Sequence, residues 1–146
     1  MSVQTPAFPP GGAIAVKYTC DGGNISPRLL INGVPLNAKS LALVLDDANA
    51  DGGPLTHWAM WNIPSSATAI AEGTAPPGAV VGTTSFGTAA YTGPCPPQGE
   101  RHQYVLRLYA LDTRLTIPPG AKREEFLRAL LGHELEEDEV MGFYRR

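Results

Sequence analysis

Strong alternation of residue types marks the segment from residue 102 to residue 112 as a β-strand. With a period of two, these side chains share one face of that strand: His102, Tyr104, Leu106, Leu108 and Ala110. The strand follows directly after residues 91–99, where Pro94, Pro96 and Pro97 fix φ and remove backbone donors, which excludes helix and central sheet. The pattern predicts a buried strand that presents an imidazole and a phenol beside a stiff loop.

Further strands are predicted along the rest of the chain. Residues 40–45 form a continuous apolar run, typical of a strand that is covered on both faces. In residues 57–63, alternation places His57, Ala59, Trp61 and Ile63 on one face. Shorter or weaker strand patterns occur at residues 13–19, 29–34, 67–71, 79–81 and 140–144. The acidic run at residues 134–139 is interpreted as a solvated surface.

One helix pattern appears, at residues 121–131. Its apolar stripe consists of Phe126, Leu127, Leu130 and Leu131, and Gly132 is a natural stop. The 16 glycines and 14 prolines are distributed between the short strands, as expected for turns. A length of 146 residues suits one domain with one sizeable core. The expected fold is mainly β, a single β-sandwich-like domain over residues 1–146 with a helical appendage near its C-terminus.

Charge and targeting signals exclude several classes of protein. A net charge of -3 and the absence of a basic patch argue against nucleic-acid binding. No apolar run approaches the length of a membrane span, and the first residues lack the pattern of a signal peptide. A cytoplasmic location is therefore expected. Cys20 and Cys95, far apart and without a CxxC partner, are expected to be two free thiols.

Candidate binding groups stand at the ends of predicted strands. Asp47 follows the apolar run, while His57 and His102 each begin a strand. Strand ends can face a cleft while the remainder of the strand is packed. A carboxylate beside an imidazole orients the ring and favours its protonated form, which can donate to an anion such as phosphate. If these ends meet, they form a small pocket for an anionic or phosphorylated ligand.

Catalytic templates are largely missing. The chain has no G-x-S-x-G, no H-E-x-x-H and no Gly-rich phosphate loop followed by Lys and Ser or Thr. Cys95 with His102 and Asp47 could imitate a thiol hydrolase, but prolines flank Cys95 and no helix N-terminus activates it. A metal site from these residues and His57 is conceivable, yet no close ligand pair is present. We therefore expect no enzyme activity, no cofactor and no metal.

Several motifs resemble the phosphatidylethanolamine-binding protein family, specifically its small bacterial and archaeal branch, often called Raf-kinase-inhibitor-like. The matching segments occur in order along nearly the whole chain. They lie at residues 18–22, 26–27, 43–47, 57–58, 62–64, 86–87, 91–97, 102–104, 108–112 and 142–145. The G-P-C-P-P segment combined with H-x-Y is the most specific of them.

The resemblance implies a β-sandwich of a large and a smaller sheet, with one or two short helices near the C-terminus. It also implies an anion pocket, whose residues by motif are Asp47, His57, Gly93, Pro96, Pro97, His102 and Tyr104. The family's D-P-D-A-P stretch reads Asp47-Ala-Asn-Ala-Asp51 here, so Asn49 replaces the second carboxylate and both prolines are absent.

The hypothesis from these observations is a non-enzymatic binding protein with a pocket for phosphate or a phosphoethanolamine-like ligand. Both imidazoles would donate to the anion, and Asp47 would orient one of them or meet a cation. The alternative, by family analogy, is a protein–protein modulator or inhibitor of a kinase or protease. Two chains could pair through a sheet face or edge, and the sequence leaves that open.

Overall fold

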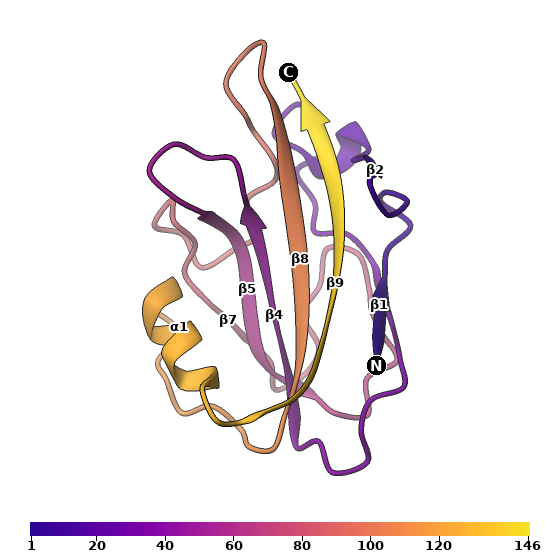
Figure 1. Ribbon diagram of the computed structural model, residues 1–146, viewed down its shortest axis with the longest axis vertical. Coiled ribbons are helices and arrows are strands. Elements are labelled where there is room, and N and C mark those ends of the chain that lie inside the picture. Colours follow the sequence, from indigo (N-terminus) through magenta and orange to yellow (C-terminus); the bar gives the residue numbers. More distant parts are fainter.

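Two β-sheets packed face to face make up the fold, as the computed structural model of residues 1–146 shows (Figure 1). The smaller sheet has the order β1-β3-β6, with strands Ser2–Gln4, Leu29–Asn32 and Ala69–Ile70. The larger sheet has the order β2-β9-β8-β4-β5-β7, with strands Gly12–Ala13, Glu134–Arg145, Arg101–Leu111, Ser40–Asp47, Leu55–Pro64 and Val80–Val81. The expected mainly β sandwich of a large and a smaller sheet is confirmed.

The main core lies between the sheets. The face of β8 predicted by the period of two points into it: His102, Tyr104, Leu106, Leu108 and Ala110 are all buried. Leu41, Leu43 and Leu45 of β4 face the same core, which the smaller sheet closes with Leu29 and Ile31. Strand β4 is buried along its whole length, as its continuous apolar run predicted.

A second apolar cluster covers the outer face of the larger sheet. The helix α1, Arg123–Leu130, lies against this face in Figure 1. Its Phe126 stacks on Trp61 of β5, with ring centroids 5.6 Å apart. Val44 and Tyr109 belong to the same cluster. This second layer explains why both faces of β4 are apolar.

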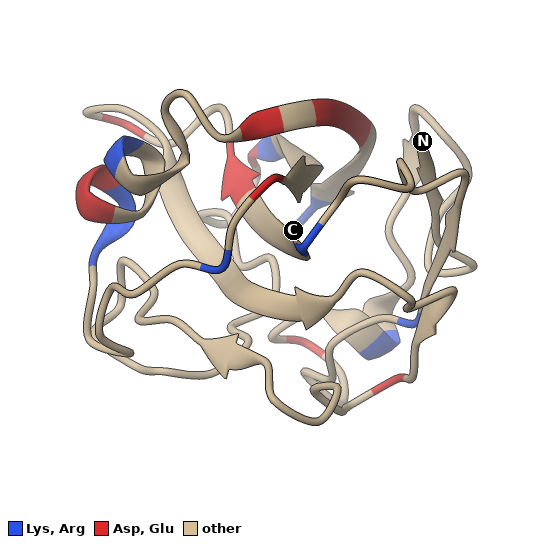
Figure 2. Ribbon diagram, turned by 90° about the horizontal axis from the view of Figure 1, so that it is seen from below, with Lys and Arg blue, Asp and Glu red and all other residues tan.

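Three local expectations are corrected. Residues 13–19 are not a strand, because only β2 pairs there and Val16–Tyr18 form a short 3-10 helix. The last strand begins earlier than residue 140, since the acidic run pairs with β8 and its exposed carboxylates line β9 (Figure 2). In β5 the alternation breaks at Asn62, where a positive φ and a register shift turn Ile63 into the inner core.

The topology brings one end each of β4, β5 and β8 together. β4 lies between β5 and β8 and is antiparallel to both, so the last residues of β4 lie beside the first residues of its two neighbours. Asp47 is directly opposite Leu55 on one side and Tyr104 on the other. No helix of the fold is long and apolar enough to cross a membrane.

Candidate functional site

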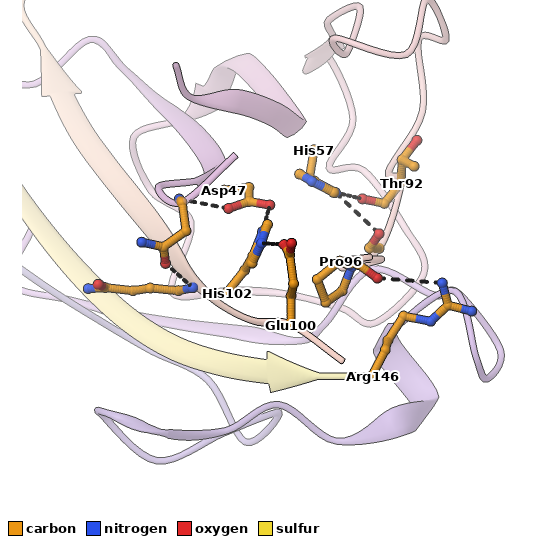
Figure 3. A network of polar contacts seen from close by, with 10 residues as sticks. Asp47, His57, Thr92, Pro96, Glu100, His102 and Arg146 are labelled. Carbon is orange, nitrogen blue, oxygen red and sulfur yellow. Dashed lines mark hydrogen bonds and ion pairs between the residues drawn. The ribbon is translucent and has the colours of Figure 1, made fainter. Parts of the chain in front are cut away.

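A buried carboxylate–imidazole pair stands at the shared end of β4 and β8. Because inward side chains alternate along β4, Asp47 follows Leu45 onto the core side of the sheet. Its Oδ2 lies 2.7 Å from Nδ1 of His102, and Asn49 N–H donates to its Oδ1 over 2.9 Å. Both side chains are more than nine-tenths buried. Asp47 and His102 are thus in direct contact, and the carboxylate orients the ring (Figure 3).

His57 enters the same region through an irregularity in β5. The register with β4 shifts between Leu45 and Asp46, which leaves His57 without a direct partner across the ladder. Such a bulge re-aims a side chain. Its ring stands edge-on to Tyr104 and Phe86, with centroids 5.3 and 4.9 Å away. Strand pairing therefore does not decide the direction of His57, and its aromatic neighbours hold it.

The hydrogen bonds of His57 define its tautomer. Nδ1 lies 2.7 Å from the carbonyl oxygen of Thr92 and 3.2 Å from that of Gly93. Carbonyl oxygens only accept, so Nδ1 carries the proton. Nε2 has no protein partner and holds a lone pair whenever the ring is neutral. Neutral His57 therefore offers the site an acceptor, whereas donation from Nε2 requires a second proton.

The loop after β7 carries the remaining predicted residues and is bound tightly to the N-terminal part of the chain. A disulfide joins Cys95 to Cys20, with their Cα atoms 5.4 Å apart. Gly93 donates to Asn24 and is packed so closely that a Cβ would lie 2.4 Å from the carbonyl oxygen of Tyr18. The expectation of two free thiols is wrong: the fold brings together two cysteines that are 75 residues apart in sequence.

A cavity of about 300 Å³ opens between these elements. Five of the residues predicted from sequence line it: Asp47, His57, Pro96, Pro97 and His102. Gly93 and Tyr104, also predicted, are not among the residues that line it. The Tyr104 hydroxyl is fully buried without a hydrogen-bond partner, and burial together with the charge of Asp47 raises its pKa.

Sequence reasoning missed several lining residues. The most important is Glu100, whose Oε2 lies 2.7 Å from Nε2 of His102. The sequence contains a pattern that could have indicated Glu100 as a lining residue. Glu100 precedes His102 by two positions, and the period of two puts both side chains on one side. Asp51 and the exposed ring of Phe86 also line the cavity.

Asn49, which stands where the family motif has its second Asp, and Asp51 have different positions relative to the cavity. The side-chain oxygen of Asn49 accepts from the backbone N–H of Gln103 over 2.6 Å, so Asn49 ties the loop after β4 to β8. Asn49 does not line the cavity, whereas Asp51 does. Asp51, two residues after Asn49, is thus a third carboxylate at the cavity, beside Asp47 and Glu100.

The two imidazoles have opposite pKa shifts. Burial lowers the pKa of His102, but the hydrogen bonds to the Asp47 and Glu100 carboxylates outweigh it, so the pKa lies above its usual value. Burial lowers the pKa of His57, and the carbonyl groups of Thr92 and Gly93 offset this only in part. His102 therefore keeps its second proton to a higher pH than an ordinary imidazole, whereas His57 takes up a second proton only at a lower pH.

A pH titration followed by NMR should separate the two rings, with the midpoint of His102 above 6.5 and that of His57 below it. The stability effects have opposite signs. The raised pKa of His102 stabilises the fold below the unfolded value of about 6.5, and this contribution disappears as the pH rises through its folded value. The lowered pKa of His57 destabilises the fold as the pH falls below about 6.5. Coincident midpoints at 6.5 would contradict the assignment.

One other groove could be mistaken for the functional site. A larger groove, of about 390 Å³, is bordered by Ile25, Trp58 and Tyr91 and has no charged residue among those that line it. It offers nothing that recognises an ion. No group of three His, Cys, Asp or Glu side chains is arranged to hold a metal ion. The cavity between Asp47, His57 and His102 is the candidate site.

A β-sandwich with a small polar pocket at the ends of its central strands defines the class of this protein. The sequence model of the phosphatidylethanolamine-binding protein family matches residues 4–145, and the chain belongs to that family. A UPF0098 protein of Methanothermobacter thermautotrophicus is 49% identical over 151 residues, covering 100% of this chain and 99% of the relative. A UPF0098 protein of Aquifex aeolicus is 36% identical, covering 100% of this chain and 89% of the relative.

Solved structures agree with this assignment. CT736 of Chlamydia trachomatis, described as a phosphatidylethanolamine-binding protein homolog, superposes with a TM-score of 0.93 at 35% identity, covering 99% of this chain and 97% of that one. YbcL of E. coli, described as a member of the mammalian family, has a TM-score of 0.93 at 29% identity, covering 99% and 98%.

Proposed function

We propose that this protein is a non-enzymatic binding protein that takes a small phosphate-bearing anion into the cavity between Asp47, His57 and His102. The observation that carries the proposal is the buried ion pair. Asp47 accepts from Nδ1–H of His102 over 2.7 Å and favours the protonated ring, in which Nε2 is an N–H donor toward the cavity. No Lys or Arg lines the cavity, so this imidazolium is its source of positive charge.

The second imidazole suits a protonated phosphate. Neutral His57 accepts at Nε2, because Nδ1–H is engaged by Thr92. Hydrogen phosphate carries both charged oxygens and a P–OH near neutral pH, and a phosphate monoester carries both in its monoanionic form, which is populated around and below its second pKa of about 6. One charged oxygen would accept from His102, and the P–OH would donate to His57. A cavity of about 300 Å³ is at the small end of ligand sites and suits a head group of this size.

Binding without catalysis is favoured by the state of the candidate nucleophile. Cys95, the thiol nearest the imidazoles, is consumed in the disulfide with Cys20. No other side chain of the cavity combines a Ser, Thr or Cys nucleophile with a neighbouring base. Asp51, at the cavity edge, would meet a cationic group attached to the phosphate, as in phosphoethanolamine.

Titration with inorganic phosphate and, separately, phosphoethanolamine should shift the NMR signals of His57 and His102 with one common dissociation constant in the millimolar range or below. His102→Ala should weaken binding roughly 10- to 100-fold, as expected for a lost hydrogen bond from a charged donor. His133 is the internal control: it forms a similar pair with Asp112, 2.8 Å apart, at the other end of β8. Silent signals from both pocket histidines at millimolar ligand would refute the proposal.

A further inference from the structure

Both ring nitrogens of His102 are held by carboxylates. Nδ1 meets Asp47 on the buried side, and Nε2 meets Oε2 of Glu100 at 2.7 Å on the cavity side. Figure 3 shows the ring of His102 between the two acidic side chains. The donor that the proposed ligand requires is thus already bonded within the chain.

We infer that Glu100 is a built-in competitor that sets the affinity and selectivity of the pocket by placing its carboxylate where an anionic oxygen of the ligand would bind. This inference rests on the proposed function. Nε2 is the one nitrogen of His102 that faces the cavity, since Asp47 covers Nδ1. A ligand oxygen can reach that N–H only after the Glu100 carboxylate has left it.

The position of the Glu100 side chain allows its carboxylate to move away from Nε2 of His102. About half of its side-chain surface is exposed (52%), whereas that of Asp47 is 5% exposed. The contact with His102 is the one hydrogen bond that the Glu100 side chain makes. Because water solvates the released Glu100 carboxylate, its contact with His102 contributes little net stability, although the His102 side chain itself is buried. Asp47 is therefore the permanent partner of the ring, and Glu100 is the exchangeable one.

Competition by a carboxylate makes the pocket selective. Acetate would replace one carboxylate–imidazole contact with an equivalent one, and it would also pay the entropy of association that the tethered Glu100 avoids. A tetrahedral phosphate gains a second contact, because its P–OH reaches His57 while a charged oxygen meets His102. Asp51 adds like-charge repulsion against simple anions. Glu100 thus disfavours monodentate anions and admits phosphates.

Dissociation constants for inorganic phosphate and for acetate should be measured on wild type, Glu100→Ala and Glu100→Gln, by NMR at one pH and ionic strength. The Ala variant removes the occupant, and the Gln variant removes its charge. We expect phosphate to bind both variants roughly five- to tenfold more tightly than wild type, the size of one exposed charge contact plus repulsion. Acetate, almost silent on wild type, should become a detectable ligand. Glu125→Gln is the matched control, because Glu125 is an exposed residue of α1 outside the cavity lining.

The outcomes separate the two proposals. Phosphate affinities that are equal in wild type and in both Glu100 variants would overturn the competitor and leave the binding function intact. Weaker phosphate binding in the variants would also overturn it, because Glu100 would then support binding, either at the ligand itself or by keeping His102 protonated. Failure of phosphate to perturb His102 in every protein would overturn both. Because Glu100 is half exposed, both variants should retain the wild-type melting temperature, which checks that the fold is unchanged.

Discussion

Replacing Cys20 and Cys95 together with serine should lower the free energy of unfolding by about 2–4 kcal/mol, with a fall in melting temperature of roughly 5–15 °C. The disulfide closes a loop of 75 residues, and opening that loop gives the unfolded chain more conformations. The bond also anchors the segment that precedes Pro96 and Pro97, so its loss loosens the cavity wall. Thermal unfolding of wild type and variant under identical conditions measures the effect.

Reductant provides the control for this prediction. Both cysteines are exposed, so a small thiol can reach the bond. Wild type in excess reductant should melt at the temperature of the double serine variant, and the variant should not respond to reductant. If wild type melts at the same temperature with and without reductant, the bond contributes no stability and the prediction is wrong.

His102→Ala should destabilise the protein by about 3 kcal/mol at pH 6, because it leaves the buried carboxylate of Asp47 without its counter-charge. The loss should shrink as the pH rises through the raised folded-state pKa of His102, where the wild-type ring also loses its proton. Urea unfolding at pH 6 and at a pH above that midpoint measures both quantities. Asp47→Ala at the same pH should be damaging for the converse reason.

A double-mutant cycle isolates the pair itself. Removing Asp47 and His102 together should be about 1–3 kcal/mol less damaging than the sum of the single changes. His133 and Asp112 offer a matched comparison, since that pair has nearly the same separation, 2.8 Å, with both side chains 47% exposed. Its coupling should be below about 1 kcal/mol. Equal coupling in the two pairs would show that burial does not strengthen the contact at the pocket.

The candidate site was predictable where a residue's position within its strand decides which way it points. His102 begins an alternating strand, so its inward direction follows from the period of two. Asp47 ends a run that is apolar on both faces, so its direction follows only from its pairing opposite Tyr104. His57 was predicted to belong to the site from its place at a strand start, but its direction depends on a bulge and on two aromatic rings. Its tautomer depends on carbonyl groups that lie 35 and 36 residues away.

The disulfide shows why other features escaped prediction. Nothing in the local sequence around Cys20 or Cys95 encodes their proximity, because contact between them depends on how the loop at residues 91–99 packs against the 3-10 helix region. The expectation of two free thiols rested on the expected cellular compartment, which says nothing about the distance between the two cysteines. Ile63 was misplaced for a similar reason, since one positive φ at Asn62 reverses the side-chain alternation after it.

By itself the sequence determined the mainly β class, the strands β4, β5 and β8, the buried face of β8 and five of the 11 residues that line the pocket. These follow from short-range periodicity and from the chemistry of strand ends, together with motifs shared across a family. Only the tertiary structure decided the disulfide, the proton positions on His57 and the contact of Glu100 with His102. Those features depend on distances between atoms of different segments. Chain order does not specify these distances, because the conformations of loops and bulges determine how closely the segments pack.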